Sequence, residues 1–361
     1  AGTAPARPRI VLVLGGGGMR GMAHIGVLKA MRTLGLHCDA IVGTSIGALV
    51  GAMAAADYSV EKMEQMISGI EKEHYFQLNV VKFLLKGTRT PSMYRGDRFR
   101  ARLAEILPDA TFADLGMPFF CNAVRLETGG AVFFGTPGFD RLPLVDAVYA
   151  SCALPGIFEP YMDGDYHYMD GGIVDPVPLR FARTLAPDVV IAVDLTVKAT
   201  MKTPNYKSRA VTTLFRAFEI AEEVVAEQNL HMHVDWRTAL VQPKIGHLSR
   251  FDFDDVPAVV RLGEEEALRT LTAHAATRDL VRTDVLVEGL ACPVTPRDFV
   301  SVRIDAEACI GCGLCEMVCE TEAFWAKGEK ATVRKRSNYE CTRDHACARN
   351  CPTGAIRLGN L

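Results

Sequence analysis

Short apolar runs alternate with longer amphipathic stretches over most of the chain, a pattern typical of α/β folds. Residues 10–14, Ile-Val-Leu-Val-Leu, are apolar without alternation, as expected for a strand that is covered on both faces. Residues 22–34 then place Ile25 and Leu28 at helical spacing, and the helical pattern stops at Gly35. The chain is therefore predicted to begin with a buried strand followed by a helix.

A second strand, turn and helix follow directly. Residues 40–42 form the strand, Gly43-Thr44-Ser45-Ile46-Gly47 forms the turn, and the small apolar residues after it suit a helix packed inside the fold. Further strands are predicted at residues 119–124, 131–134, 189–195 and 238–241, and further helices at residues 208–231 and 258–276. The fold class is therefore α/β, with at least one parallel pair of strands in its centre.

Composition and charge limit the kind of protein. The chain has 361 residues, of which 49% are hydrophobic and 23% charged, and its net charge is -3. These values predict a globular chain of one large and one small domain, with no nucleic-acid partner. No apolar run has the roughly 18 residues of a membrane span, and AGTAPARPRI at the start lacks a hydrophobic signal core. We therefore expect a cytoplasmic protein.

Ser45 is the first candidate for chemistry. In a Gly-x-Ser-x-Gly turn the serine occupies a strained backbone position that exposes its hydroxyl, and the flanking glycines let strand and helix approach closely. The N-terminus of the next helix points at the reacting oxygen, where its partial positive charge favours an alkoxide. Ser45 is therefore predicted to be a nucleophile.

The glycine-rich loop at residues 15–21 allows three interpretations. Gly16, Gly18 and Gly21 fit a dinucleotide-binding pattern, but the acidic residue that such a site needs, Asp39, precedes its strand instead of following it. Consecutive glycine N–H groups also suit an oxyanion hole, which we favour, and a loop that only permits close packing is the third interpretation. Arg20 either braces this loop or is solvated.

A nucleophilic serine needs a base, and Asp170 in Asp170-Gly171-Gly172 is the candidate. Two glycines after an aspartate let the carboxylate approach another backbone, so a direct Ser–Asp hydrogen bond can form. The carboxylate can then act as a base if burial raises its proton affinity. A simple hairpin turn is the structural alternative. A Ser-Asp-His triad is the catalytic alternative, with the histidine drawn from residues His231, His233 and His247.

Residues 9–286 resemble the patatin-like phospholipases, including the bacterial relatives of neuropathy target esterase. The resemblance rests on four ordered blocks: Gly16-Gly17-Gly18-Met19-Arg20-Gly21 with His24-Ile25-Gly26-Val27-Leu28, Gly43-Thr44-Ser45-Ile46-Gly47, Ala150-Ser151-Cys152-Ala153-Leu154-Pro155-Gly156-Ile157-Phe158-Glu159-Pro160, and Asp170-Gly171-Gly172. It implies a three-layer domain with a central, largely parallel sheet, a dyad of Ser45 and Asp170, and hydrolysis of lipid acyl esters. It also implies an oxyanion hole at the glycine loop, made of Gly16, Gly17 and Gly18 with Arg20 beside them.

A lysine-flanked apolar stretch at residues 75–86 bears on the substrate. One hypothesis makes it a lid or an interfacial patch that meets a lipid surface, at the inner face of a membrane. A helix that faces the core explains the same residues equally well.

Seven of the eleven cysteines lie in the last 53 residues, in a spacing that is typical of iron-sulfur clusters. The first run is Cys309-x2-Cys312-x2-Cys315-x3-Cys319, and the second is Cys341-x5-Cys347-x3-Cys351 followed by Pro352. Zinc and a decayed second site are the alternatives, although the spacing differs from that of a zinc ribbon. The upstream cysteines share no spacing and are interpreted as packing residues: Cys38, Cys121, Cys152 and Cys292.

Residues 299–361 resemble a bacterial two-cluster ferredoxin, a small α+β domain. The resemblance implies that the fourth cysteine of each run ligates the other cluster. A first, 4Fe-4S cluster then has four ligands: Cys309, Cys312, Cys315 and Cys351. A second, 4Fe-4S or 3Fe-4S cluster has three cysteines, with Asp344 where the family has a fourth: Cys319, Cys341 and Cys347.

Together these observations predict a lipid acyl hydrolase at residues 9–290, preceded by a tail at residues 1–8 and joined by a linker at residues 291–298 to the iron-sulfur module. The expected partners are a lipid or acyl-ester substrate, a membrane surface and a redox protein. A basic patch near Trp325 would attract the redox protein, and it consists of Lys327, Lys330, Arg334, Lys335 and Arg336. Two alternatives stay open. One is an electron-transfer protein whose hydrolase-like domain binds an acyl ligand or a membrane, and the other is an acyltransferase that uses the same acyl-enzyme.

Overall fold

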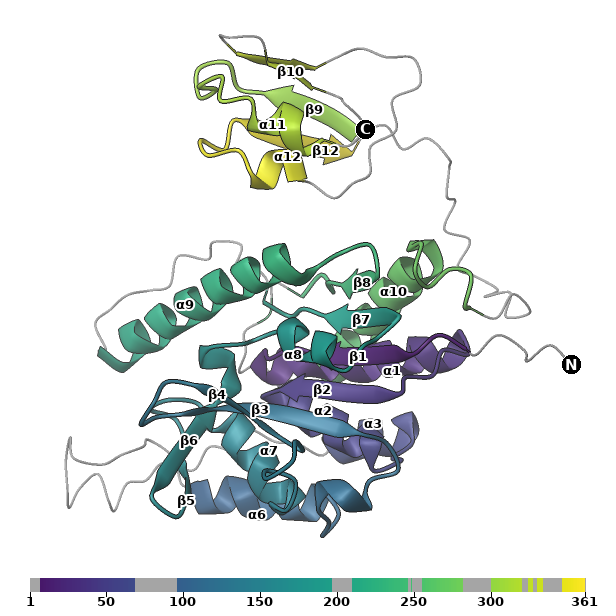
Figure 1. Ribbon diagram of the computed structural model, residues 1–361, viewed down its shortest axis with the longest axis vertical. Coiled ribbons are helices and arrows are strands. Elements are labelled where there is room, and N and C mark those ends of the chain that lie inside the picture. Colours follow the sequence, from purple (N-terminus) through teal and green to yellow (C-terminus); the bar gives the residue numbers. More distant parts are fainter. Residues whose placement is uncertain are drawn as a thin grey trace, which may run out of the picture. The chain divides into compact units, whose positions relative to one another are not determined.

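The computed structural model describes residues 7–68, 96–196, 210–245, 248, 255–281, 300–319, 324–326, 330–333 and 346–360. The chain divides into two compact units, residues 1–286 and residues 287–361. Figure 1 shows the helices and strands of both units. The first unit holds the serine and glycine motifs, and the second holds the cysteine runs.

The first unit is built on an eight-stranded sheet. Its strands are β1 (Ile10–Leu14), β2 (Ala40–Thr44), β3 (Phe119–Arg125), β4 (Ala131–Phe134), β5 (Tyr161–Asp163), β6 (Tyr166–Asp170), β7 (Val189–Val193) and β8 (Thr238–Val241). The order is β5-β6-β3-β2-β1-β7-β8, with β4 paired to β3. The strands from β3 to β8 along this order are parallel, whereas β4, β5 and β6 pair antiparallel. The predicted central, largely parallel sheet is confirmed.

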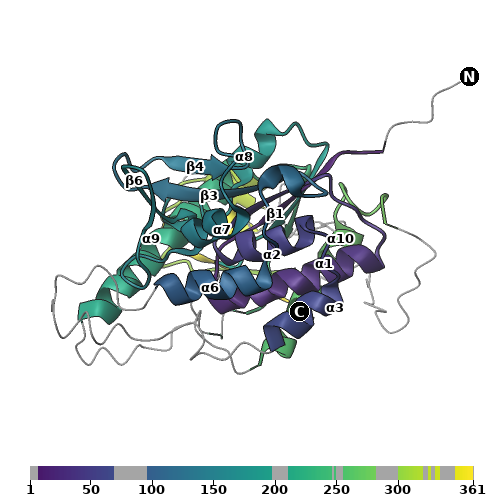
Figure 2. The same ribbon diagram turned by 90° about the horizontal axis from the view of Figure 1, so that it is seen from below.

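Helices cover both faces of this sheet. They are α1 (Ala23–Thr33), α2 (Ile46–Ala55), α3 (Val60–Ser68), α6 (Gly96–Ile106), α7 (Leu144–Cys152), α8 (Leu179–Thr184), α9 (Ala210–His233) and α10 (Val256–Ala273). Short 3-10 helices lie between them: η1 (Gly18–Met22), η3 (Phe112–Asp114) and η4 (Gly171–Ile173). Figure 2 shows α1, α2, α3, α6 and α10 together on one face.

The first strand shows how the sequence produces these layers. Leu12 and Leu14 of β1 belong to the larger core, with residues of α1, α2 and α10, whereas Val11 and Val13 belong to a smaller core with Leu179 of α8. Successive side chains of a strand point to opposite faces, so a strand covered on both sides must be apolar at every position. The continuous apolar run at residues 10–14 therefore reflects a three-layer fold.

Polar side chains account for two of the differences between the observed and the predicted boundaries. Helix α10 starts at Val256, where the side chain of Asp255 accepts a hydrogen bond from the backbone N–H of Ala258. Strand β7 ends at Val193, since the next residue, Asp194, accepts hydrogen bonds from the backbone N–H and the hydroxyl of Thr196. Both caps act through side-chain contacts that a hydrophobic pattern does not contain.

A glycine brings the first strand against the helix that follows Ser45. A methyl group placed on Gly47 would lie 2.1 Å from the carbonyl oxygen of Leu14, a distance that no real side chain permits. The absence of a side chain at Gly47 thus lets α2 start directly beside the end of β1. This contact fixes the position of Ser45 relative to the glycine loop.

The second unit is small and has its own core. Its elements are β9 (Val300–Ile304), α11 (Leu314–Val318), β10 (Phe324–Ala326), β11 (Ala331–Val333), α12 (Ala346–Arg349) and β12 (Ile356–Asn360). Strand β12 pairs antiparallel with β9, and β10 with β11. Phe324, Ile356 and several cysteines form the core. An α+β module held together around its cysteines agrees with the predicted fold class.

None of the helices in the described part of the chain combines the length and the apolar character needed to cross a membrane.

Candidate functional site

Ser45 lies at a sharp turn between β2 and α2. Its backbone has φ 55° and ψ -123°, a conformation that non-glycine residues rarely adopt. The backbone N–H of Ser45 donates to the hydroxyl of Ser151 at 3.0 Å, which holds the turn in place. Such strain persists only where the surrounding contacts impose it, and it is typical of nucleophilic serines at strand-to-helix turns.

Asp170 is the last residue of β6, and the structure brings it into contact with Ser45. The hydroxyl of Ser45 donates to Oδ2 of Asp170 at 2.6 Å, while Oδ1 accepts a hydrogen bond of 2.8 Å from the backbone N–H of Gly172. Ser45 is 7% exposed and Asp170 is 1% exposed. A buried carboxylate thus lies in direct position to take the proton of the hydroxyl.

This contact bears on the triad alternative. A hydrogen bond of 2.6 Å between serine and aspartate leaves no place for an imidazole between them. His231 and His233 lie at the C-terminal end of α9, where His231 is exposed and the carbonyl oxygen of His233 accepts a hydrogen bond from Arg183. His247 falls outside the described residues. The described geometry therefore favours the aspartate as the direct base.

The glycine loop presents two amides to this site. The N–H of Gly16 donates to the carbonyl oxygen of Pro176 at 2.9 Å, so it is already engaged. Gly17 is the N-cap of η1 and Gly18 its first residue, and within the described residues their N–H groups donate to no backbone carbonyl. Gly18 has φ 61°, which favours glycine. Of the three glycines expected in an oxyanion hole, Gly16 donates to a backbone carbonyl, whereas Gly17 and Gly18 do not.

The side chain of Arg20 braces the loop. Its Nε and Nη2 donate to the carbonyl oxygen of Leu248 at 3.0 and 2.6 Å, and the residue is 8% exposed. Its guanidinium is therefore directed at the backbone of a distant segment. Asp39, the acidic residue considered for a dinucleotide site, accepts a hydrogen bond from the N–H of Ile10 at the start of β1. That position is at the opposite end of the strand from the glycine loop.

The side chain of His24 forms a hydrogen bond with the same loop. It is fully buried in α1, and its Nε2 donates to the carbonyl oxygen of Gly15 at 2.8 Å. Burial lowers the pKa of His24 to about 4, against a smaller opposing effect of that hydrogen bond. A neutral imidazole at physiological pH thus fixes the orientation of the loop without adding a charge near Ser45.

Asp175 joins the two strands that carry the serine and its neighbours, a role the sequence did not reveal. Its carbonyl oxygen accepts hydrogen bonds from the hydroxyl of Thr44 at 3.0 Å and from the amide of Asn122 at 2.9 Å. Its carboxylate accepts one from the amide of Asn229 on α9 at 2.9 Å. A single residue after η4 thereby connects β2, β3 and α9.

The carboxyl group of Asp175 predicts a pH dependence of stability. Burial raises its pKa to about 7, while Asn229 and Arg180 act in the opposite direction. The folded state therefore keeps this proton from about pH 4 to about pH 7, whereas the unfolded state has released it, so stability falls as the pH rises from about 4 to about 7 and then levels off. Between about pH 5 and pH 8 the free energy of unfolding of the wild type should therefore fall relative to that of Asp175→Asn, by at most about 3 kcal/mol.

Urea unfolding of both proteins at the two pH values measures this difference. Asp188→Asn, a change at a residue whose carboxylate accepts a hydrogen bond from the N–H of Arg9, is the control. If the free energies of unfolding of the wild type and Asp175→Asn changed in parallel with pH, Asp175 would ionise over the same pH range in the folded and the unfolded state.

Two of the upstream cysteines are buried in the first unit. Cys121 and Cys152 are 0% and 7% exposed, and burial raises the pKa of both thiols well above the usual range. Cys38 is partly buried and packs against the larger core. These positions agree with packing roles, while Cys292 falls outside the described residues.

Four cysteines of the second unit surround one cavity. They are the four that the resemblance to two-cluster ferredoxins assigns to the first cluster: Cys309, Cys312, Cys315 and Cys351. The rest of the lining is largely apolar, with Ile310 and Ile356 among its residues. In the described part of the chain, no three potential ligands converge as closely as a single metal ion requires. Four thiols around a shared cavity suit a larger, polynuclear group.

Hydrogen-bond donors around these sulfurs also fit a cluster of thiolates. The backbone N–H of Ala331 donates to Sγ of Cys309 at 3.4 Å. Burial alone would raise the pKa of Cys351, but hydrogen bonds from the hydroxyl of Thr353 and from three backbone amides lower it overall. Donors that stabilise a thiolate tune the sulfurs of iron-sulfur clusters in the same way.

The predicted second cluster is described only in part. Cys347 is buried and Cys319 is partly buried in the core of the second unit, whereas Cys341 and Asp344 fall outside the described residues. The apolar stretch at residues 75–86 and most of the basic patch near Trp325 also fall outside.

Comparison with known proteins adds two matches. Residues 12–183 match the family described as patatin-like phospholipase, and residues 302–325 match the 4Fe-4S binding domain. The first match includes Ser45, Asp170 and the glycine loop, and the second includes the first cysteine run.

Similar proteins cover the same part of the chain. Lysophospholipase nte1 of Emericella nidulans is 32% identical over 186 residues, which are 51% of this chain and 12% of that protein. Patatin-like phospholipase domain-containing protein 6 of Homo sapiens is 36% identical over 188 residues, 52% of this chain and 13% of that protein. An uncharacterized NTE family protein of Mycobacterium tuberculosis is 31% identical over 188 residues, 52% of this chain and 49% of that protein.

This chain thus spans about half the length of the mycobacterial relative and far less of the other two. The shared part is the α/β unit that carries the serine turn, the glycine loop and the aspartate. The chain therefore contains a patatin-like phospholipase domain, followed toward its C-terminus by a 4Fe-4S binding domain.

Proposed function

We propose that the protein hydrolyses acyl esters of lipids, with Ser45 as nucleophile and Asp170 as general base. The observation that carries this proposal is the 2.6 Å hydrogen bond between a serine at a strained turn and a buried carboxylate. The match of residues 12–183 to the patatin-like phospholipases supports it.

Catalysis begins with transfer of the Ser45 proton to Oδ2 of Asp170 as Oγ attacks the ester carbonyl carbon. The negative charge that develops on the carbonyl oxygen is stabilised by the amides of Gly17 and Gly18. The tetrahedral intermediate then expels the alcohol, which takes the proton from Asp170. Water repeats the sequence on the acyl-enzyme, with Asp170 again as base, and releases the fatty acid.

Several contacts prepare Ser45 for this role. Ser151 holds its backbone N–H, and Gly172 holds the carboxylate of Asp170 through Oδ1, leaving Oδ2 for the hydroxyl. Helix α2 begins at the next residue, so its N-terminal partial charge favours the alkoxide form of Ser45. These groups are already oriented for the transition state and need no reorganisation during the reaction. Such preorganisation is the main source of electrostatic catalysis.

The proposed substrate class is a lipid acyl ester, for which a lysophospholipid is the first probe because one relative is named a lysophospholipase. Fatty acid release from lysophosphatidylcholine and hydrolysis of a short-chain nitrophenyl ester test the proposal together. Both activities are expected in the purified chain. Transfer of the acyl group to an added alcohol, instead of to water, would favour an acyltransferase.

For the second unit we infer a 4Fe-4S cluster on Cys309, Cys312, Cys315 and Cys351, and a further cluster that uses Cys319, Cys341 and Cys347 with or without Asp344. The cavity lined by four cysteines supports the first, and the match of residues 302–325 supports an iron-sulfur module in general. A bound cluster supplies one-electron chemistry. Comparison of hydrolysis rates with the module oxidised and reduced tests redox control of the esterase, and equal rates would exclude it.

Removal of one ligand predicts a defined loss of metal. Cys312→Ala should lose at least about four iron atoms and four sulfides per chain, because Cys312 lines the cavity of the first cluster. Iron and sulfide counting with electron paramagnetic resonance, on protein purified without air, measures this loss. Cys38→Ala, a change in the first unit, should keep the iron of the wild type. Full iron content in Cys312→Ala, or zinc in the wild type, would contradict the ligand assignment.

A further inference from the structure

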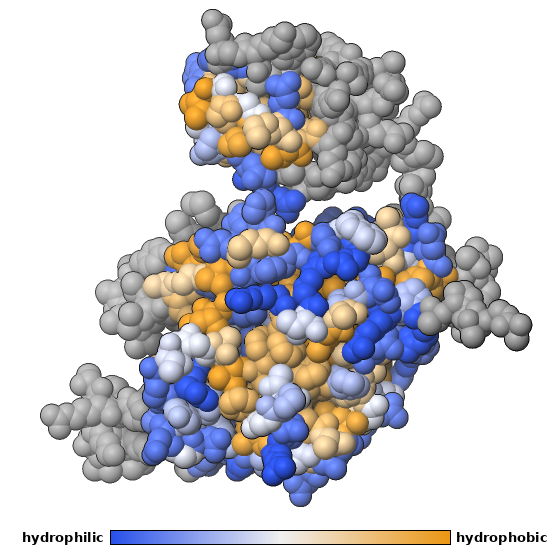
Figure 3. All heavy atoms as spheres, viewed as in Figure 1, coloured by the Kyte–Doolittle hydropathy of each residue, from blue (hydrophilic) through white to orange (hydrophobic). Residues whose placement is uncertain are grey.

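The hairpin of β5 and β6 extends the sheet beyond the serine turn. Strand β2 pairs with β3 as far as Asn122, and β6 pairs with the next residues of β3, with Asp170 opposite Ala123. Strand β6 thus lies beside the part of β3 that continues past the end of β2, and the tip of the hairpin lies further from Ser45. Hydrophilic side chains predominate where β5 and β6 lie, at the lower left of the first unit in Figure 3. The hairpin therefore joins the buried dyad to a water-exposed surface.

Arg125 of β3 lies on the same face of the sheet as Asp170. The side chains of Tyr166, Tyr168 and Asp170 point to one face, because they alternate along β6. Arg125 pairs directly with Tyr168 and shares that face. Its guanidinium carbon lies 4.1 Å from the centre of the Tyr166 ring and 5.6 Å from that of the Tyr168 ring. These tyrosines precede Asp170 by two and four residues, so the guanidinium lies roughly 7 to 13 Å from Asp170 along the strand.

In the described part of the chain, no carboxylate pairs with Arg125. Its Nη2 donates to the hydroxyl of Tyr168 at 3.1 Å, while its Nε is buried and has no acceptor. Glu127, two residues further along, is engaged by His167, whose Nδ1 lies 2.7 Å from Oε1 and whose backbone N–H donates to the same oxygen at 3.1 Å. The ring of Tyr166, 45% exposed, holds the guanidinium near the surface without neutralising its charge. Arg125 is therefore free to pair with an anion.

The position and the charge of Arg125 suit the phosphate of a phospholipid. A guanidinium presents parallel N–H donors that match two phosphate oxygens, and it stays charged at every physiological pH. In a lysophospholipid the glycerol unit separates the acyl ester from the phosphate by a few bonds, which is compatible with the spacing between Asp170 and the guanidinium. A phospholipid whose ester reaches Ser45 can therefore place its phosphate at Arg125.

We propose that Arg125 binds the phosphate of the lipid substrate, with the ring of Tyr166 and the hydroxyl of Tyr168 holding its guanidinium in place. This inference rests on the proposed hydrolase function and deepens it, because it makes a phospholipid, rather than a neutral glyceride, the preferred ester. Inorganic phosphate offers the same oxygens without an acyl chain, so it serves as a separate probe.

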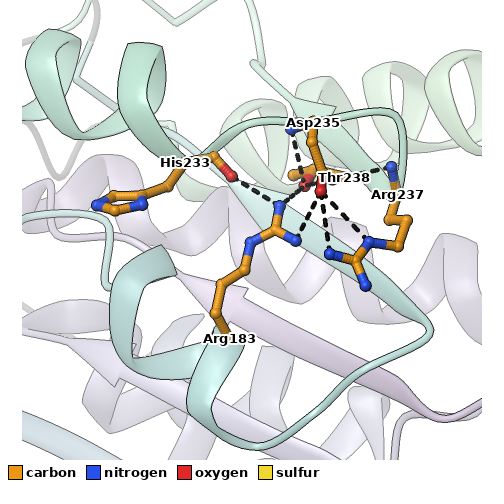
Figure 4. Close-up of polar contacts among 5 residues, drawn as sticks. All are labelled: Arg183, His233, Asp235, Arg237 and Thr238. Carbon is orange, nitrogen blue, oxygen red and sulfur yellow. Dashed lines mark hydrogen bonds and ion pairs between the residues drawn. The ribbon is translucent and has the colours of Figure 1, made fainter.

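Arg237 provides a matched control. Its guanidinium also lies near an aromatic ring, 5.7 Å from the centre of the Trp236 ring, but it is paired with Asp235, which Arg183 contacts as well. Figure 4 shows both arginines directed at Asp235. Arg237 directly precedes β8, at the end of the parallel strands opposite to Ser45. Its charge is therefore neutralised, and it lies at the wrong end of the sheet to meet the substrate.

Hydrolysis of two soluble esters tests the proposal. One is a lysophosphatidylcholine with a short acyl chain, and the other is a monoacylglycerol with the same acyl chain and no phosphate. Arg125→Gln should lose about tenfold or more in kcat/KM on the lysophospholipid, because a charge-assisted contact is removed, and should keep the wild-type value on the monoacylglycerol. Arg125→Lys, which keeps the charge but not the paired donors, should fall between the two on the lysophospholipid. Arg237→Gln should match the wild type on both esters.

Lipid binding to the Ser45→Ala protein tests the phosphate contact without turnover. The probe is an ether analogue of lysophosphatidylcholine, and its affinity is measured by titration calorimetry. Adding Arg125→Gln to Ser45→Ala should weaken this binding by at least about tenfold. Inorganic phosphate should bind far more weakly than the ether lipid, because it gains no apolar contact. Equal affinities for the two would mean that the site takes free phosphate, which would overturn the proposal.

The outcomes separate the phosphate contact from the proposed function. An equal loss on both esters in a folded Arg125→Gln protein would make Arg125 a structural residue of the hairpin and overturn the proposal. Unchanged rates on both esters in Arg125→Gln would overturn it as well. Binding of the ether lipid that depends on Arg125, in a wild type that hydrolyses no ester, would instead reject the proposed hydrolase and keep the phosphate contact.

Discussion

Replacing Ser45 with alanine is expected to reduce ester hydrolysis by about 10⁴-fold or more, because it removes the hydroxyl that Asp170 contacts and that forms the acyl-enzyme. The strained turn makes this an informative change. Alanine at a backbone of φ 55° is strained as serine is, so the fold and the iron content should be retained. Initial rates on the soluble nitrophenyl ester, with circular dichroism and iron counts on the same preparation, measure the effect.

The matched control for Ser45 is Ser59. Ser59 is an exposed serine that accepts a hydrogen bond from the N–H of Lys62, and Ser59→Ala should keep full activity. If a folded Ser45→Ala protein hydrolysed the ester at an appreciable fraction of the wild-type rate, the nucleophile would have to be another group.

Replacing Asp170 with asparagine is expected to reduce hydrolysis by about 10²-fold to 10⁴-fold, the usual contribution of a general base. Asparagine keeps the shape of the side chain and an oxygen that accepts the 2.8 Å hydrogen bond from Gly172, but it cannot take the proton of Ser45. The effect should appear mainly in kcat, because the substrate-binding surface is unchanged. Steady-state kinetics on the soluble ester separate kcat from KM.

Asp163→Asn provides the control for this second change. Asp163 is exposed on β5, in the hairpin that ends at Asp170, so its removal alters the same hairpin without touching the site. A large loss of activity in Asp163→Asn would mean that the hairpin, rather than the carboxylate of Asp170, is the sensitive element.

The local chemistry of the site could be predicted from the sequence, because its parts are short and contiguous. The run at residues 10–14 predicted a strand with the observed bounds, and the turn around Ser45 follows from glycines at both flanks. Neighbouring residues determine such features through backbone conformation and hydrophobic pattern.

Features that depend on contacts between distant segments could not be predicted. The amide of Gly16 is engaged by Pro176, 160 positions further along the chain, and the N–H of Ser45 by Ser151. The pattern of residues 208–231 predicts a helix, but it gives no indication that Asn229 of this helix donates to Asp175. These contacts arise only when the parallel sheet brings the ends of its strands together.

In the cysteine runs, too, local features could be predicted and long-range contacts could not. Their spacing predicted which four thiols share a cavity, because a tight loop fixes the distances among Cys309, Cys312 and Cys315, and the family pattern adds Cys351. The donors that surround the sulfurs come from other strands and turns, as the N–H of Ala331 does for Cys309. The spacing therefore indicates the ligands, and the fold determines their surroundings.

The most direct test of the central claim is the identity of the residue that carries the acyl group. The protein is mixed with a short-chain nitrophenyl ester, quenched in acid within the first turnover, digested and analysed by peptide mass spectrometry. We predict an acyl adduct on Ser45 that disappears as the fatty acid is released and does not form in Ser45→Ala. An adduct on another residue, or ester hydrolysis of wild-type speed in Ser45→Ala, would contradict a reaction that proceeds through this serine.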